Sequence, residues 1–365
     1  MLLDPAGWSL AHRIDTLLPE LSQRLADSVS AETHACTLEL ATGPHATVRA
    51  AAAELYALRV ALAEELEPQG LRPAVAGTHP LAQGHEVEVS AGARYQLLHE
   101  GLRELARREP TFALHVHVGV PDAELAVRAA DRLRAHLPLI LALSANSPFW
   151  AGRDSGMASV RTPLFQAFPR AGVPRRAGSY ATYVERLDVL LRAEAFPEPT
   201  FVWSDVRLQP RFGTVEVRVA DAQTGVAEVA AIAAVIQALV RIEATEGLAA
   251  EALVDSQEVI EENRFLAARD GMAAQLVDPV IEGRVPAGER FAELLEACAG
   301  HAGSLDSSAE LEVAAVLARR SGADHQRQLA RTHGMEGVLP ELAGAFLDPT
   351  SLVAEVAALV AAARS

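Results

Sequence analysis

A carboxylate and a guanidinium stand two residues apart in the segment Phe212 to Asp221. Side chains alternate between the two faces of a strand, so Glu216 and Arg218 are predicted to share one face while the intervening valines occupy the other, buried face. A carboxylate oxygen can bind Mg²⁺, and a fixed guanidinium can hold phosphate or carboxylate oxygens in bidentate geometry. The same spacing also occurs in solvated ion pairs, so both interpretations remain open for this segment alone.

Three more strand-like segments carry acidic, basic or imidazole groups on one face. His115 and His117 alternate with valine, Glu39 lies between two leucines, and Asp205 and Arg207 are two residues apart. Imidazole is a common metal ligand, but two histidines without a nearby carboxylate are a weak zinc signal, and polar residues on a half-exposed strand explain them equally well. A solvent-facing strand surface is usually rich in lysine, and these faces contain none. Together the four segments therefore favour a shared chemical site.

Helical and strand patterns alternate along the chain without a low-complexity linker. Helical periodicity predicts helices over 46–66, 94–107, 123–143, 180–192, 226–243 and 351–363. Strands are predicted over 35–42, 72–77, 112–120, 200–208 and 213–220. The segment 146–178 is rich in Gly, Pro and Arg and is interpreted as a long active-site loop with one short helix. The apolar stretch 229–240 is too short to span a bilayer and is interpreted as a buried helix.

Several motifs, in order and spread from about residue 2 to the C-terminus, resemble the YbdK-type carboxylate-amine ligases, also called the glutamate-cysteine ligase type 2 family. The motifs are Thr78-His79-Pro80, His115 to Pro121, Leu143 to Trp150, Gly152-Arg153-Asp154, Phe212 to Asp221 and Glu262-Asn263-Arg264. The resemblance implies an α+β fold with a curved, mostly antiparallel sheet, similar to glutamine synthetase and the guanidino kinases. Its concave face would carry the chemistry and helices would cover the outer face. We expect one domain over 1–365, with about 248–365 as a helical scaffold.

The resemblance also implies an ATP-dependent ligase that activates glutamate, or a similar carboxylate, as an acyl phosphate and joins it to an amine such as cysteine. In the roles expected from it, Glu39, His115 and Glu216 hold Mg²⁺. Arg218 clamps phosphate, and Arg207 holds a substrate carboxylate or the acyl phosphate. Arg153 and Arg161 would close the site, and Asn263 would contact the nucleotide or the amino acid. For Arg153, Arg161 and Asn263, an ordinary loop or helix hydrogen bond is an equal alternative.

Two departures from the family pattern affect this expectation. Members open with a Gly-x-Glu-x-Glu strand whose carboxylates help to hold Mg²⁺, whereas this sequence opens with Met1-Leu2-Leu3-Asp4-Pro5. Ala35 stands where relatives often have a further glutamate. We expect an in-frame segment upstream of Met1 that supplies the strand. The alternative is a catalytically silent homologue that binds ATP or an amino acid. A histidine-metal hydrolase is a poorer third interpretation, because the histidines lack helical spacing and a nearby general-base glutamate.

Composition fits a cytoplasmic enzyme. The 365 residues are 50% hydrophobic and 22% charged, and the net charge of −16 argues against nucleic acid or an anionic membrane surface as a partner. The expected partners are small molecules, namely ATP, an amino acid and an amine; a homo-oligomer is compatible with the sequence. Cys36 and Cys298 are too few for a disulfide framework and are interpreted as buried thiols. Charged residues near the N-terminus argue against a signal peptide.

Overall fold

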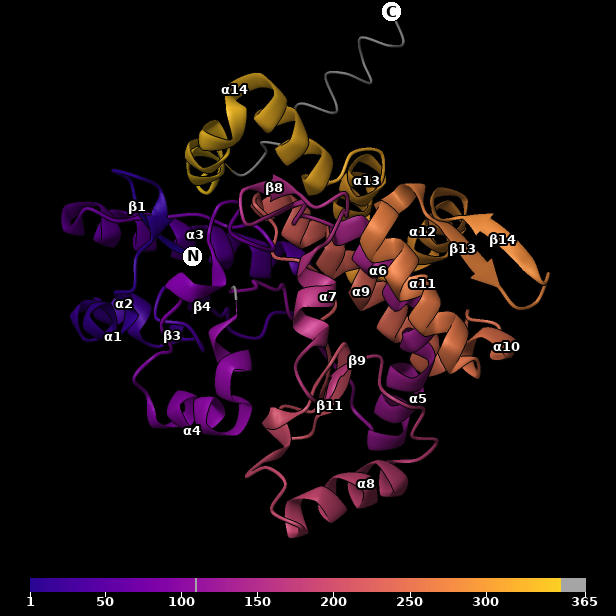
Figure 1. Ribbon diagram of the computed structural model, residues 1–365. Helices are drawn as coiled ribbons and strands as arrows, with labels where there is room; N and C mark the ends of the chain where they lie inside the picture. Colours follow the sequence, from indigo (N-terminus) through magenta and orange to yellow (C-terminus); the bar gives the residue numbers. More distant parts are fainter. Residues whose placement is uncertain (109, 349–365) are drawn as a thin grey trace, which may run out of the picture.

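The computed structural model describes residues 1–108 and 110–348 (Figure 1). Its helices are α1 (Ile14–Leu17), α2 (Gln23–Ala26), α3 (Val48–Leu66), α4 (Ala93–Leu102), α5 (Ala123–Leu133), α6 (Leu137–Ser144), α7 (Arg161–Gln166), α8 (Tyr180–Arg192), α9 (Val226–Thr245), α10 (Glu251–Val254), α11 (Gln257–Asp270), α12 (Ala287–Leu305), α13 (Ser308–Leu317) and α14 (Gly322–Ala345). Its strands are β1 (Leu2–Asp4), β2 (Ser9–Leu10), β3 (Val29–Ala31), β4 (Leu38–Leu40), β5 (Arg72–Pro73), β6 (Val116–Gly119), β7 (Phe149–Trp150), β8 (Arg153–Asp154), β9 (Ala171–Gly172), β10 (Trp203–Ser204), β11 (Val206–Gln209), β12 (Thr214–Val217), β13 (Gln275–Asp278) and β14 (Gly283–Pro286).

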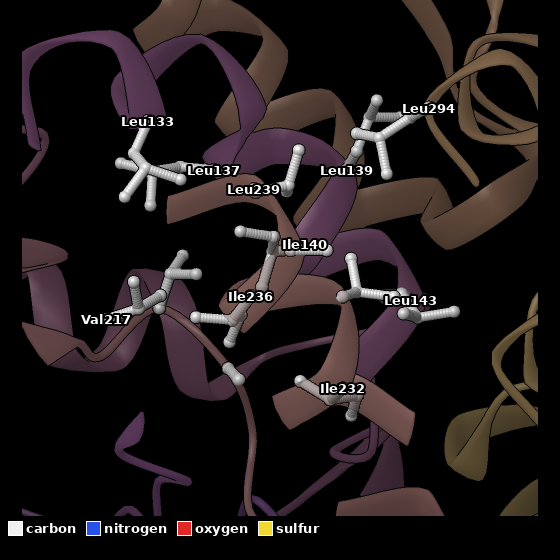
Figure 2. Packing of buried hydrophobic residues seen from close by; sticks show 14 of the residues in the cluster. Leu133, Leu137, Leu139, Ile140, Leu143, Val217, Ile232, Ile236, Leu239 and Leu294 are labelled. Atoms are coloured by element: carbon white, nitrogen blue, oxygen red, sulfur yellow. The ribbon is translucent and has the colours of Figure 1, made fainter. Parts of the chain in front are cut away.

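The central sheet is antiparallel, with the strand order β11-β12-β6. Val215 and Val217 of β12 are fully buried, as the alternating pattern predicts, and they belong to the same core as helices α5, α6 and α9. Figure 2 shows Val217 below Leu133 and beside Ile236, which come from α5 and α9. This packing fixes the sheet from one side, so the opposite face of β12 is free to carry polar groups.

A layer of helices forms the rest of this core. Helix α9 is buried along most of its length and packs against α3, α5, α12 and α13, while α6 packs against α11. The predicted buried helix over 229–240 therefore lies inside α9. Figure 1 shows α5, α6, α9, α11, α12 and α13 on the right, with the β13–β14 hairpin beside them, whereas α3 lies on the left among the N-terminal elements. None of the helices in the described ranges is both long and apolar enough to cross a bilayer.

The N-terminal residues form a second group of elements, on the left of Figure 1. Strands β2-β1-β5 form a small antiparallel sheet and β3 pairs with β4. Apolar residues of β1, α1, α2 and α3 make a separate core, which Phe346, just beyond α14, also enters. In this arrangement the β3–β4 hairpin and α4 lie on one side of the molecule's centre, with α7, β9 and β11 opposite them (Figure 1).

The predicted α+β class is confirmed, with differences of detail. The strands are shorter than predicted and form several small sheets within the described ranges; the β9–β10 pair is parallel. The predicted helix over 123–143 is interrupted between α5 and α6, because Pro138 lacks an amide hydrogen and its ring restricts the preceding turn. The predicted helical scaffold also contains the β13–β14 hairpin, which the alanine-rich sequence did not indicate. The predicted helix over 351–363 lies outside the described residues.

Candidate active site

Glu216 lies at the centre of a charged group on the polar face of the sheet. Strand pairing places it between Arg207 on β11 and His117 on β6. Arg207 donates hydrogen bonds from Nε and Nη2 to the two oxygens of Glu216, at 2.6 and 3.2 Å, and Arg218 donates to one of the same oxygens. Burial alone would raise the pKa of Glu216, but the charge of Arg218 and the hydrogen bond and charge of Arg207 outweigh it, so the pKa is lowered. Glu216 is therefore an ionised carboxylate held between two guanidinium groups.

Arg207 is fully engaged by protein groups. Besides its two bonds to Glu216, its Nη1 donates to the backbone carbonyls of Thr200 and Val202, at 3.0 and 2.6 Å. The side chain is 11% exposed. The guanidinium thus joins the loop before β10 to the carboxylate on β12, and this geometry makes it a brace between two chain segments.

Arg218 and Arg161 are the other guanidinium groups at this face. Arg218 lies next to Glu216, with Nη1 3.4 Å from Nδ1 of His115. Arg161, at the start of α7, is 5% exposed; it donates to the carbonyls of Val219 and Arg218 and lies 3.6 Å from Asp221. In the described part of the chain, the buried Nε atoms of Arg218 and Arg161 have no hydrogen-bond partner. These are donors that an anionic ligand could satisfy.

His115 is held in its neutral form. Desolvation, followed by the positive charges of Arg218, Arg161 and Arg207, lowers its pKa well below the ordinary value. His117 has a pKa that is lowered less severely, chiefly by desolvation, because the nearby Glu216 acts in the opposite direction. The two imidazoles that share a face in the sequence pattern therefore differ in environment, and His115 is the better candidate for a neutral metal ligand.

Two carboxylates face the sheet from the N-terminal side. Glu39 on β4 and Glu32, just after β3, are both solvent-exposed and line the same cavity as Glu216, Arg218 and His115. Desolvation in the cavity wall raises the pKa of Glu32, and the negative charge of Glu39 raises it further, so the two carboxylates interact. This pair brings negative charge to a cavity whose opposite wall is rich in arginine.

The cavity between these walls has a volume of about 520 Å³, within the range of small-molecule sites. The Met1 amino group lies in its wall and donates to the carbonyl of Ala74, at 3.0 Å, and burial lowers the pKa of this amine to about 6. Arg59 lines the same region and donates to the backbone carbonyls of Gln223 and Thr224, just before α9, and of Phe346, just beyond α14. The cavity therefore reaches from the central sheet to the N-terminal core.

The carboxylates of the cavity suit a Mg²⁺ ion that is bound only partly by protein groups. Across the described ranges, no three His, Cys, Asp or Glu side chains are close enough together to form a metal cluster. Mg²⁺ rarely uses an all-protein cage; it is usually bound through one or two carboxylates, substrate phosphates and water. The Glu32–Glu39 pair, beside unpaired arginine nitrogens that suit phosphate, meets that requirement.

Comparison with known proteins tests the family that the sequence motifs indicate. The model of the family described as "Glutamate-cysteine ligase family 2(GCS2)" matches residues 2–343. The chain belongs to this family. This confirms the family indicated by the motifs and places the chain among ligases that form a carbon–nitrogen bond.

Individual relatives agree with the family match. The chain is 38% identical to the "Putative glutamate--cysteine ligase 2-3" of Rubrobacter xylanophilus, over 94% of each chain. It is 37% identical to the "Putative glutamate--cysteine ligase 2" of Sorangium cellulosum, over 85% of this chain and 84% of the relative. The crystal structure of a glutamate–cysteine ligase from Francisella tularensis in complex with AMP has a similar fold. The TM-score is 0.67 at 14% identity, with 98% of this chain and 89% of that chain covered.

Arg153 and Asn263, which the sequence analysis placed at the site, lie outside the cavity wall. Arg153 is exposed on β8 and is not part of the cavity wall. Asn263 is buried on α11, where its amide donates to the carbonyl of Val277 at 2.8 Å and accepts from the Val277 amide at 2.6 Å. These bonds fasten β13 to the helix. The neighbouring Arg264 forms a buried ion pair with Asp205, which ties α11 to the segment between β10 and β11.

Glu32 is a carboxylate of the cavity wall that sequence reasoning missed. From the sequence, Ala35 was noted only as the position where relatives often have a further glutamate; Ala35 is buried and does not line the cavity. No signal in the sequence indicated Glu32, because β3 was not predicted; in the structure Ser30 pairs with Glu39, so Glu32, just beyond β3, lies near β4. Tyr95 was also missed; its hydroxyl donates to the Ala31 carbonyl and helps to hold this turn.

Proposed function

We propose that this protein is an ATP-dependent carboxylate-amine ligase that activates glutamate, or a similar carboxylate, and joins it to an amine such as cysteine. The observation that carries the proposal is one cavity with a carboxylate pair, Glu32 and Glu39, on one wall and the Arg207–Glu216–Arg218 group on the other. Family membership and a fold shared with a ligase crystallised with AMP support it.

The reaction has two chemical stages. A glutamate carboxylate oxygen attacks the γ-phosphorus of ATP, and the bond to the β-phosphate oxygen breaks, which gives an acyl phosphate and ADP. The amine nitrogen then attacks the acyl carbon, the carbon–oxygen bond to phosphate breaks, and the nitrogen loses a proton as the amide forms. Negative charge accumulates on the transferring phosphoryl group in the first stage, so fixed positive groups accelerate it.

Arg218 is the residue assigned to that charge. Its guanidinium is oriented by Glu216, its Nε remains a buried donor, and His115 beside it stays neutral. Arg161, anchored through Asp221 and two carbonyls, adds a second positive group from α7. Arg207 keeps Glu216 in place, a role different from the substrate contact expected for it from the sequence.

Glu32 and Glu39 would hold Mg²⁺. His115 and Glu216, which were expected from the sequence as further ligands, line the same cavity, but in the described ranges they form no three-residue ligand cluster with Glu32 or Glu39. When bound, the ion supplies positive charge that neutralises phosphate oxygens. A bound cation would also favour the charged form of Glu32, whose pKa is raised by desolvation and by the negative charge of Glu39.

The test is the substrate dependence of ADP and phosphate release. With Mg-ATP, release is expected only when glutamate or a similar carboxylate is present, and neither EDTA-treated nor zinc-substituted samples should turn over. Arg218→Ala should lower the rate at least ~100-fold, as the loss of one transition-state contact typically does. Turnover that is unaffected by EDTA contradicts the proposal. Nucleotide binding without turnover on any carboxylate would instead identify the catalytically silent homologue.

A further inference from the structure

The Glu262-Asn263-Arg264 motif lies on α11, outside the cavity wall. Its arginine is 8% exposed and donates from Nε and Nη2 to the two oxygens of Asp205, at 2.5 and 3.2 Å. Asp205, between β10 and β11, is 4% exposed and does not line the cavity either. A contact with substrate therefore does not explain this buried ion pair.

Asp205 lies next to the arginines of the cavity. The β11–β12 ladder continues one residue beyond the two strands, where the amide of Arg218 donates to the Asp205 carbonyl at 2.7 Å. The charge of Asp205 also reaches Arg161: desolvation lowers the pKa of Arg161, and the negative charges of Asp221 and Asp205 act against that shift. Asp205 is thus a buried carboxylate beside both arginines to which phosphate is assigned.

A carboxylate in this position would compete with an anionic ligand. In the described part of the chain, the buried Nε atoms of Arg161 and Arg218 have no hydrogen-bond partner. A buried carboxylate without a partner of its own would turn to the nearest available donors, because an unpaired buried charge is costly. Arg264 prevents this, since its two hydrogen bonds occupy both oxygens of Asp205.

Helix α11 also holds the segment that leads to Arg161. Two carbonyls in the last turn of the helix accept hydrogen bonds from the amides of Ala158 and Ser159, at 2.9 and 2.8 Å. The helix therefore fixes Asp205 through a side chain and the start of α7 through its backbone. Both contacts determine the surroundings of Arg161.

We propose that Arg264 is a positioning residue for the cavity: it holds Asp205 in an ion pair and so keeps that carboxylate from the two arginines that would bind phosphate. Arg161 and Arg218 thereby keep their Nε donors for the ligand. This inference rests on the proposed function, because it concerns the same phosphate-binding arginines. Arg264 acts only through Asp205 and does not touch the ligand.

The experiment is a double-mutant cycle on the binding of inorganic tripolyphosphate with Mg²⁺, measured by calorimetry. The variants are Arg264→Gln, Asp205→Asn and the two combined. Arg264→Gln should weaken binding about 10-fold, because the released carboxylate competes with the ligand; this is a typical coupling within one ion-pair network. Asp205→Asn should stay within about 3-fold of the wild type, and the combined variant should return to the same level, since Arg264 has no role once the carboxylate is absent.

One comparison does not require Arg264→Gln to fold. Asp205→Asn with and without Arg264→Gln should bind tripolyphosphate equally, whereas a direct phosphate contact by Arg264 would make the combined variant weaker. In turnover, kcat/KM for ATP should fall in Arg264→Gln and recover in the combined variant, while the KM of the amine stays unchanged.

Arg132→Gln is the matched control. Arg132 forms another buried ion pair, with Glu243 at 2.6 Å, and lies outside the cavity wall. The substitution should lower the unfolding free energy without changing tripolyphosphate binding, so it separates a general loss of stability from the effect proposed for Arg264.

Four outcomes overturn the proposal. These are unchanged tripolyphosphate binding in folded Arg264→Gln, a combined variant weaker than Asp205→Asn, equal weakening by Arg132→Gln, or a tightening by Asp205→Asn that is the same with and without Arg264. The last result would mean that the two charges act on the ligand independently. If the wild type binds tripolyphosphate and turns over, these results remove the positioning role and leave the proposed ligase intact. If the wild type does neither, the proposed function itself fails.

Discussion

Replacing Glu216 by glutamine is the most informative single perturbation of the site, because this one carboxylate is the counter-charge for two arginines. Its side chain is 2% exposed, and those of Arg207 and Arg218 are 11% and 12% exposed. The alternating strand pattern alone predicts little effect on folding, because the valine face is unchanged. The structure predicts the opposite: two buried guanidinium groups would face a neutral amide. Leaving a buried charge without its partner typically costs about 3–5 kcal/mol of unfolding free energy.

The unfolding free energy lost in Glu216→Gln should depend on pH. The pKa of Glu216 is lowered in the folded protein, so its stabilisation is fully present above the ordinary glutamate value of 4.5 and is lost as the pH falls below it toward the folded value. Urea unfolding of wild type and Glu216→Gln should therefore differ most near neutral pH and converge in acid. Activity should fall at least ~100-fold at a pH where both proteins are folded, because Arg218 loses its orienting partner.

Glu67→Gln is the matched control. Glu67 pairs with Arg72 at 2.7 Å, but both side chains are well exposed, and such a pair contributes no more than about 1 kcal/mol. The reasoning is refuted if Glu216→Gln and Glu67→Gln lose similar amounts of unfolding free energy. It is also refuted if the stability difference for Glu216→Gln is independent of pH.

Three further predictions concern residues other than Glu216 and its two arginine partners. Burial would raise the pKa of Glu243, but its bonds to His136 and Arg132 lower the pKa to about 2. Glu243→Gln should therefore lower the unfolding free energy by about 3 kcal/mol near neutral pH. Urea unfolding at a series of pH values should show this loss disappearing between pH 4.5 and about 2. The ring of His115 should remain neutral from pH 8 down to 6, so a protonation detected by NMR in that range would contradict the desolvation described for it. Asn263→Ala should lower the unfolding free energy by about 1–3 kcal/mol through its lost backbone bonds and leave the KM for ATP unchanged; a higher KM at unchanged stability would indicate a nucleotide contact instead.

The residue pattern within single segments was sufficient to predict which side chains of the central sheet share a face. The period of two on β12 predicted that Glu216 and Arg218 share a face opposite the valines, and the structure has Val215 and Val217 in the core. Long helices with sustained periodicity, such as α8 and α9, were also predicted nearly to their ends. These features depend on residues a few positions apart, which is the range over which a side-chain pattern is informative.

The partners of each charged group could not be predicted in the same way. Arg207 and Glu216 are on different strands, and they meet because the register of β11 and β12 aligns them. The sequence assigned Arg207 to a ligand because nothing local revealed that Glu216 and two backbone carbonyls would occupy its donors. The backbone partner of Asn263 could not be predicted for the same reason, since β13, which it fastens, was not predicted as a strand.

The cavity wall that carries Glu32 and Glu39 shows how contacts between distant residues determine the environment of a charged group. Glu39 alone is one carboxylate on a short strand, but the β3–β4 hairpin brings Glu32 close enough for the charge of Glu39 to add to desolvation in raising the pKa of Glu32. A bound cation would therefore lower the pKa of Glu32. The hairpin places the exposed Glu32 in the cavity wall, which its position before a predicted strand did not indicate.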